Sequence, residues 1–156
     1  MPSWGAFRAR ESELAEAGRA LLYRVGVGLA YLATVRRDGG PRVHPVCPLI
    51  HGEGLYAFIV PGPKRADLHR EGRYALHSFP TEDDEDAFYC TGPALPVRDG
   101  ATRRALADLF VAERSALAVP RPGDDQDLFA LEVERCLLTR TTGHGDPSPR
   151  HVVWKA

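Results

Sequence analysis

Hydrophobic positions recur along the first half of the chain at helical and then at strand spacing. Five apolar residues at helical spacing, which we call the helical set, predict an amphipathic helix over residues 11–25. The apolar run 29–35 is rich in strand formers, and the Asp-Gly pair at residues 38–39 is a strong hairpin signal. A return strand is expected over 42–50 and a third strand over 55–60. The first half therefore predicts an antiparallel meander covered by a helix. The helical set is Leu14, Ala17, Leu21, Leu22 and Val25.

The second half alternates short helices with strands. Asp99 is placed to cap one of these helices, and every second residue from Phe129 to Leu137 is assigned to one face of a long half-buried strand. The sum is six or seven antiparallel strands with peripheral helices, which is a mostly β member of the α+β class. The expected elements are a helix over 63–70, a strand over 74–79, an acidic solvated loop over 81–86, a strand over 87–97 bent at Gly92 and Pro93, a helix over 102–114 with Leu106, Leu109, Phe110 and Val111 inward, the strand over 129–137 and a last strand over 151–155.

Two prolines interrupt the second predicted strand. Pro45 and Pro48 each remove a backbone N–H from the ladder. This favours an edge, a bulge or a place where the ladder opens to something other than a neighbouring strand.

Length and charge narrow the class of protein. A chain of 156 residues with 44% hydrophobic residues suits a single domain over residues 1–156. With 20 Lys and Arg against 21 Asp and Glu, no global basic field attracts nucleic acid or an anionic membrane. No apolar run approaches the roughly 18 to 20 residues of a membrane span, and residues 1–10 contain no signal-peptide core. A cytoplasmic location is predicted.

Three cysteines stand apart from one another and beside apolar residues. Cys47, Cys90 and Cys136 therefore predict buried thiols and no disulfide framework. His44 and Cys47 are three residues apart, a spacing that places them on opposite faces of a strand, and no second ligand pair completes a zinc set. No metal site is predicted.

The junction at residues 61–68 carries an unusual charge pattern. Lys64 and Arg65 lie in the first turn of the predicted helix and Glu71 lies near its end, opposite to the preference of the helix dipole. Free backbone N–H groups with two cations form a phosphate site, to which Arg42 on a neighbouring strand adds a third charge. The alternative is an exposed helix with solvated charges.

A series of short motifs resembles the pyridoxamine 5'-phosphate oxidase-like family in order and spacing. The resemblance covers residues 10–98 well and the last strand more loosely. It implies a split β-barrel homodimer that binds FMN, or in a large subgroup the deazaflavin coenzyme F-420, at the subunit interface. The motifs are Tyr31-Leu32-Ala33-Thr34-Val35, Asp38-Gly39-Gly40-Pro41-Arg42-Val43-His44-Pro45-Val46, Leu55-Tyr56-Ala57-Phe58, Pro61-Gly62-Pro63-Lys64-Arg65-Ala66-Asp67-Leu68 and Gly72-Arg73-Tyr74-Ala75-Leu76-His77-Ser78.

The resemblance also implies which residues line the cofactor. The residues carried over are Arg42, His44, Pro45 and Val46 of the second strand, Ile59 and Val60 of the third, and Lys64 and Arg65 for the phosphate. Two positions depart from the family. Many relatives have Ser-Arg-Lys where this chain has Gly62-Pro63-Lys64. Ala87 stands where the oxidases place an amide side chain, which argues against pyridoxamine 5'-phosphate oxidase activity itself.

The predicted activity is two-electron transfer between a flavin and a small organic substrate. Because the ring system performs the hydride chemistry, the protein contributes orientation and electrostatics, and no catalytic side chain is assigned. His44, His77 and Tyr31 are candidate proton donors, although a lone strand histidine is more often a packed core residue. The alternatives are a non-catalytic flavin-binding or regulatory barrel and a haem-binding relative, whose known members carry extra segments.

Overall fold

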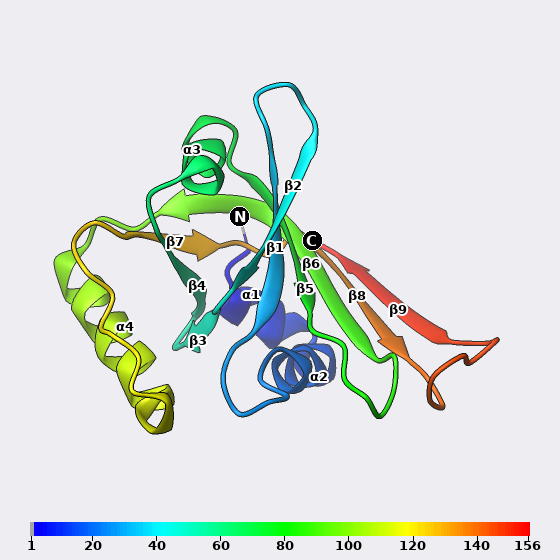
Figure 1. Ribbon diagram of the computed structural model, residues 1–156. Helices are drawn as coiled ribbons and strands as arrows, with labels where there is room; N and C mark the ends of the chain where they lie inside the picture. Colours follow the sequence, from blue (N-terminus) through cyan, green and yellow to red (C-terminus); the bar gives the residue numbers. More distant parts are fainter. Residues whose placement is uncertain (1) are drawn as a thin grey trace.

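The structure is a computed structural model that describes residues 2–156, in which nine strands form one curled antiparallel sheet flanked by helices (Figure 1). The mostly β, α+β class is confirmed. The elements are α1 (Trp4–Arg10), α2 (Ser12–Leu22), β1 (Ala30–Val35), β2 (Pro41–Val46), β3 (Leu49–His51), β4 (Gly54–Ile59), α3 (Pro63–Arg70), β5 (Arg73–Ser78), β6 (Ala87–Pro96), α4 (Gly100–Glu113), a 3-10 turn (Ser115–Leu117), β7 (Asp127–Leu131), β8 (Arg135–Arg140) and β9 (Arg150–Lys155).

Strand β6 joins the two halves of the barrel. The strand order is β2-β1-β5-β6-β7-β4-β3, and β8 and β9 extend from the first half of β6. Residues 87–91 of β6 pair with β8, whereas residues 94–96 pair with β7. The predicted bend at Gly92 and Pro93 lies between these two pairings. A Cβ atom on Gly92 would lie 2.0 Å from the carbonyl oxygen of Glu132, so only glycine permits this approach.

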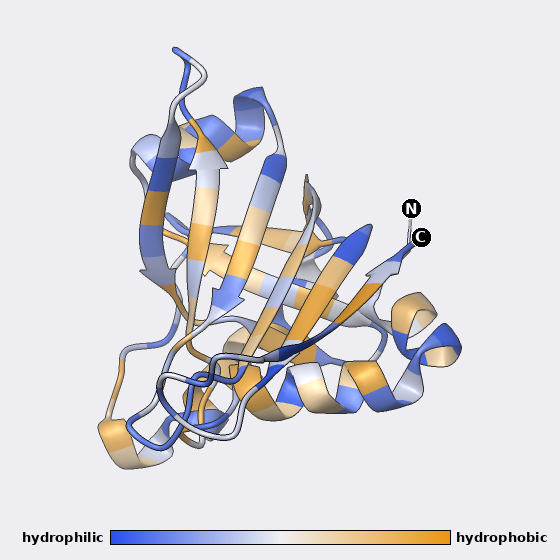
Figure 2. Ribbon diagram, turned by 90° about the vertical axis from the view of Figure 1, so that its right-hand side faces the viewer, coloured by the Kyte–Doolittle hydropathy of each residue, from blue (hydrophilic) through white to orange (hydrophobic). Residues whose placement is uncertain are grey.

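The main core lies between the curved sheet and the first two helices. Trp4 and Phe7 of α1 are almost fully buried, as is Phe88 of β6, and Trp4 makes edge contacts with both phenylalanine rings. Figure 2 shows apolar residues recurring along the strands and on α2. Helices α1 and α2 therefore cover the inner face of the barrel.

The N-terminal region differs from its prediction because two helices replace one. Helix α2 ends at Leu22, so Val25 lies outside it and is exposed. Helix α1 was not predicted, and it begins where the side chain of Ser3 accepts a hydrogen bond from the N–H of Ala6. A short helix of this kind is stabilised by the burial of its aromatic side chains more than by its own propensity.

The predicted strand over 42–50 is two strands, β2 and β3, in different halves of the barrel. β2 pairs with β1, β3 pairs with β4, and Cys47 and Pro48 connect them. The opening predicted from the prolines is therefore the place where the barrel splits.

The predicted strand over 129–137 is also two strands, and the single-face assignment of its residues is wrong beyond Val133. Glu134 and Arg135 are both exposed, after which burial resumes at Cys136. The backbone N–H groups of Glu132 and Glu134 donate to the carbonyls of Pro93 and Thr91, so β6 remains the neighbour on one side. The neighbour on the other side changes from β4 to β9. These two divisions account for nine strands where six or seven were predicted.

Helix α4 is confirmed with its predicted cap, since the side chain of Asp99 accepts from the N–H of Thr102 at 2.8 Å. Its predicted inward face is confirmed for Leu106, which is buried, and for Leu109 and Phe110, which are half-buried and pack against the same cluster. Val111 is half-buried outside this cluster. The helix lies to one side of the barrel (Figure 1).

Candidate functional site

Strand β2 presents different residues on its two faces. Arg42, His44 and Val46 pair with buried residues of β1, so they lie on the inner face, where Arg42 and His44 are half-buried. Pro45 pairs with Tyr31 and lies with it on the outer face, exposed. The four cofactor candidates of this strand are therefore divided between two faces, because successive strand residues point to opposite sides.

Asp67 of α3 is the centre of a buried polar cluster. Its carboxylate accepts hydrogen bonds from the hydroxyl of Thr34 at 2.8 Å, from Nε of Arg42 at 2.8 Å and from Nη2 of Arg70 at 3.1 Å. The Asp67 side chain is only 3% exposed. The cluster fixes α3 against β1 and β2 and leaves the Nη1 and Nη2 atoms of Arg42 without hydrogen bonds within residues 2–156.

Burial and hydrogen bonding shift the pKa of Asp67 in opposite directions. Burial raises the pKa of this carboxyl, but the hydrogen bonds from Arg42, Thr34 and Arg70 together outweigh burial and hold the pKa below its ordinary value of 3.8. Asp67 is therefore a carboxylate at neutral pH, and it compensates the positive charge of the arginines that bind it.

Lys64 has a different environment three residues earlier. Its side chain is half-buried, and it makes no hydrogen bond or ion pair with any described residue. Burial lowers the pKa of Lys64, while the neighbouring Cys47 raises it by a smaller amount. The ammonium group thus lies partly out of water, beside the split of the barrel, without an anionic partner.

The backbone at the start of α3 is open as well. Gly62 precedes the helix at φ +154°, a conformation that favours glycine, and it provides no side-chain cap. Pro63 occupies the first turn, and the N–H of Ala66 makes the first helical bond, to the carbonyl of Gly62. The N–H groups of Lys64 and Arg65 therefore point out of the helix end.

Arg65 turns away from Lys64. Its Nη1 donates to the carbonyl of Asp125 at 2.6 Å, and its Nε lies 3.6 Å from the carboxylate of Asp127. Of the two predicted phosphate-binding cations, only Lys64 has a side chain that the protein leaves unpaired in its described part.

The third-strand candidates also differ from each other. Ile59 is 1% exposed and belongs to the main core, whereas Val60 is 47% exposed just before the helix. The side chain of Val60 is therefore accessible to a ligand from this subunit, and that of Ile59 is enclosed by the barrel.

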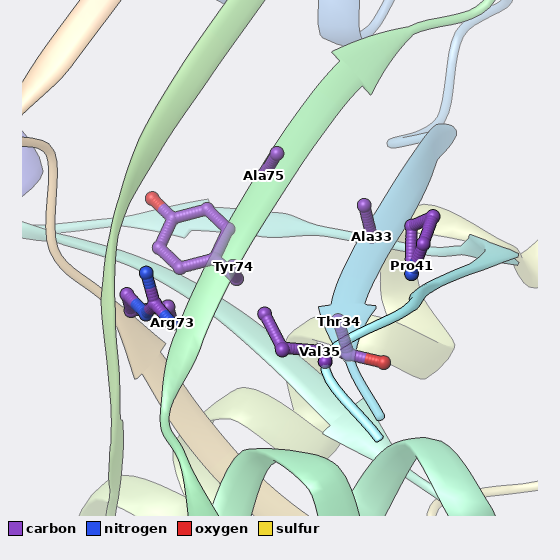
Figure 3. A pocket seen from close by; sticks show the side chains of 8 residues that line it. Ala33, Thr34, Val35, Pro41, Arg73, Tyr74 and Ala75 are labelled. Carbon is purple, nitrogen blue, oxygen red and sulfur yellow. The ribbon is translucent and has the colours of Figure 1, made fainter. Parts of the chain in front are cut away.

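The outer face of β1, β2 and β5 contains a shallow hollow of about 240 Å³. Figure 3 shows Ala33, Val35, Pro41, Arg73 and Ala75 around it. Small side chains dominate this lining, so the sheet surface is open to a flat apolar group.

Two candidate proton donors lie on the same outer face. Tyr31 is 38% exposed and stacks on Phe79 with ring centroids 4.3 Å apart. His77 pairs with Tyr31, is exposed, and its Nδ1 lies 2.7 Å from the carbonyl of Ser78. The third candidate, His44, lies on the inner face, so the three do not form one group.

The cysteines are free thiols. Cys90 and Cys136 are fully buried, and burial raises the pKa of each to about 12. Cys47 is half-buried beside the split, so the burial predicted for it is only partial.

Residues 2–156 contain no group of three His, Cys, Asp or Glu side chains arranged to hold a metal ion. In the same range, no helix combines the length and the apolar character that crossing a membrane requires.

The role of Asp67 was missed from the sequence. The Asp67 and Arg70 spacing is a recognisable helical ion pair, but the partners Thr34 and Arg42 are distant in sequence and meet Asp67 only through the pairing of β1 with β2. The pairing of His69 with Asp127 was missed for the same reason.

Comparison with known proteins relates the chain to solved structures alone. No family model and no curated protein matches it. A haem-binding protein from Mycobacterium smegmatis superposes with a TM-score of 0.67 at 16% identity, over 89% of this chain and 57% of that one. The chain therefore spans little more than half the length of that protein.

Two other solved structures match nearly end to end. One is a Clostridium acetobutylicum protein related to general stress protein 26, of the pyridoxinephosphate oxidase family, with a TM-score of 0.61 at 15% identity over 96% of this chain and 94% of that one. The other is PhzG from Burkholderia lata, in complex with tetrahydrophenazine-1-carboxylic acid, with a TM-score of 0.60 at 13% identity over 99% and 94%. These likenesses show the split-barrel fold of pyridoxamine 5'-phosphate oxidase-like proteins, as the motifs predicted.

Proposed function

We propose that this split barrel is a flavin-dependent oxidoreductase that transfers two electrons to or from a small organic substrate in the cytoplasm. FMN is the proposed cofactor, and the deazaflavin coenzyme F-420 is the alternative. The observation that carries the proposal is the unpaired, half-buried Lys64 at the uncapped start of α3. A partly desolvated cation beside free N–H groups is the environment that a phosphate group stabilises.

The residues at the split of the barrel fit a flavin phosphate. Lys64 supplies an ammonium, the N–H groups of Lys64 and Arg65 supply backbone donors, and Arg42 retains donors that Asp67 does not use. Gly62 leaves the approach open, since a Cβ atom built there meets no atom within 4 Å. The side chain of Arg65 is engaged elsewhere, so its proposed contribution is mainly its backbone.

When a flavin is bound, its ring system supplies the redox chemistry. The protein residues then bind the phosphate through Lys64 and place the exposed Val60 beside the ligand, while Val46 belongs to the main core behind the split. His44 on the inner face of β2 is a candidate for holding a proton near the ring.

The proposed assembly is a homodimer that covers the outer face of the sheet. Val43 and Val153 on this face are 59% and 53% exposed, and no described helix covers it (Figure 1). An uncovered apolar sheet face favours association, and a second copy of the chain completes a cofactor site at the interface. One row of paired residues crosses this face through Pro45, Tyr31, His77, Tyr89, Leu137 and Val153.

A non-catalytic barrel that only binds a flavin, or serves regulation, is the second candidate. The haem-binding protein from Mycobacterium smegmatis supports this candidate, because a protein of the same fold is described there as a binding protein. The two candidates share the cofactor site and differ only in substrate turnover.

The test is a fluorescence titration of the purified protein with FMN and with F-420, followed by reduction and reoxidation. The proposal predicts tight quenching of one flavin, bleaching by a reductant and reoxidation that a small organic acceptor accelerates. Binding without accelerated reoxidation supports the non-catalytic candidate. Absence of binding to either flavin contradicts both.

A further inference from the structure

A second charged hollow lies on the other side of α3, and the flavin proposal does not use it. It has a volume of about 240 Å³ and is formed where the end of β6, the start of α4 and the start of β7 meet (Figure 1). We call it the α3–α4 cleft. Its polar lining is His69, Arg98, Arg103 and Asp127, over an apolar floor of Pro96, Val97 and Leu128.

The two arginines of the cleft keep unused donors. Arg103 binds the carbonyls of Gly123 and Gln126 through Nη2 alone, which fixes its guanidinium while Nε and Nη1 make no hydrogen bond with described residues. Arg98 is exposed and has no hydrogen bond or ion pair in the described range. Planar guanidinium groups with free N–H donors match the oxygen atoms of phosphate.

The single carboxylate of the cleft is already compensated. Asp127 lies 2.7 Å from Nε2 of His69 and 3.6 Å from Nε of Arg65. The hydrogen bond with His69 and the charge of Arg65 hold the pKa of Asp127 below its ordinary value. Partial burial opposes this shift but does not outweigh it. Asp127 therefore faces Arg65 and Arg103 together, so its one negative charge does not balance both arginines. Arg98 adds a further positive charge that has no ion pair with a described residue.

His69 adds a directed ring nitrogen. Its Nε2 is held by Asp127 and its ring lies over Phe129 with centroids 5.0 Å apart, so its orientation is fixed from two sides. This leaves Nδ1 available to exchange a hydrogen bond with a ligand.

The size of the cleft restricts what it binds. Pockets for drug-sized molecules enclose about 300–1,000 Å³, so a hollow of this volume accommodates a small molecule and excludes a flavin. We propose that the α3–α4 cleft binds a phosphate group carried by a small molecule, with Arg98 and Arg103 on its oxygens and His69 beside it. This site is separate from Lys64, which does not line the cleft.

The test is a titration of ¹⁵N-labelled protein with inorganic phosphate at constant ionic strength, with chloride as the balancing anion. The proposal predicts saturable shifts in the amide signals of residues 97–103 and 127. It also predicts that Arg98→Ala weakens binding about tenfold, the loss expected for one charge-assisted contact. The matched control is Arg104→Ala, which removes the same charge from an exposed position one residue beyond Arg103 and is expected to bind normally.

Three outcomes contradict the cleft site. The first is equal affinity in Arg98→Ala and Arg104→Ala, and the second is the same shifts with chloride alone. The third is that the shifts centre on residues 62–65 and disappear in Lys64→Ala. Because Lys64→Ala is expected to lose flavin and keep phosphate binding in the cleft, failure of one proposal is distinguishable from failure of the other.

Discussion

The two halves of helix α3 differ in whether their charged side chains have partners within the protein. Asp67 and Arg70 in the second half belong to a buried cluster in which the carboxylate has three hydrogen-bond donors. Lys64 in the first turn has no partner among described residues, although burial lowers its pKa. Charges that the fold itself compensates hold the helix in place. A charge left uncompensated at partial burial is costly to the fold, which is why we assign it to a ligand.

The largest expected effect is on the compensated half. Asp67→Ala leaves Arg42 and the hydroxyl of Thr34 without their shared acceptor, so it is expected to destabilise the protein by about 3 kcal/mol. Urea unfolding measures this loss. The control is Asp108→Ala, whose carboxylate is 70% exposed and pairs with Arg121, and whose expected cost is below about 1 kcal/mol. Equal losses in the two variants contradict the assignment of Asp67 as a structural centre.

The next effect separates binding from stability in the uncompensated half. Lys64→Ala is expected to weaken flavin binding by about 1.5 to 3 kcal/mol, the contribution of a charge-assisted contact. Its free energy of unfolding is expected to be unchanged or to rise by up to about 1 kcal/mol, because the substitution removes a partly desolvated charge. Fluorescence titration and urea unfolding of the same sample check both. The matched control is Arg10→Ala, an exposed cation in the last turn of α1. Unchanged flavin affinity in Lys64→Ala rules out the phosphate assignment.

The contribution of Asp67 to stability is also expected to depend on pH. Because the pKa of Asp67 in the folded protein lies below its ordinary value of 3.8, its contribution to stability is present above that value and is lost as pH falls toward the folded pKa. Asp67→Asn removes this titration. The stability difference between parent and Asp67→Asn is expected to be constant above about pH 5 and to shrink below about pH 4. A difference that stays constant down to pH 2 contradicts an ionised, hydrogen-bonded Asp67.

The smallest effect is expected at Arg65, the neighbour of Lys64. Its guanidinium is engaged by Asp125 and Asp127 at the surface, so Arg65→Ala is expected to cost less than about 1 kcal/mol in urea unfolding. Flavin affinity is expected to fall by less than about threefold, because the backbone N–H remains. An affinity loss equal to that of Lys64→Ala means that the side chain of Arg65 turns toward the ligand. That result contradicts the claim that only Lys64 offers its side chain to the phosphate.

Local signals in the sequence predicted the parts of the fold that depend on neighbouring residues. The hairpin at residues 38–39 and the cap at Asp99 use chemistry confined to a few positions, and the structure confirms both. Such signals predicted the antiparallel α+β class, and the split barrel was implied by the resemblance of the ordered motifs to the pyridoxamine 5'-phosphate oxidase-like family.

The divided strands were not predictable in this way. Residues 132–134 read as part of one alternating strand, but their backbone N–H groups donate to Pro93 and Thr91 of β6, which are distant in sequence. The apolar residues at 129, 131, 133 and 137 continue one alternation in the sequence, whereas two consecutive exposed residues, Glu134 and Arg135, move the buried face to Cys136.

The candidate site shows the same limit. The motif at Lys64 and Arg65 predicted a cationic helix start, and the structure places both residues there. The sequence gives no sign that Arg65 turns toward Asp127 or that Asp67 uses the Nε of Arg42, because both depend on strands that meet α3 only after folding.

The most direct test of the account follows the ionisation of Lys64 itself. The chain has only two lysines, Lys64 and Lys155, so labelling the lysine ε-carbons with ¹³C gives two NMR signals that Lys64→Arg assigns. We expect the pKa of Lys64 to lie below 10.5 in the free protein and to rise when FMN or F-420 binds, while the pKa of Lys155 does not change. A flavin that binds, as its quenched fluorescence shows, without raising the pKa of Lys64 contradicts the phosphate site at the start of α3.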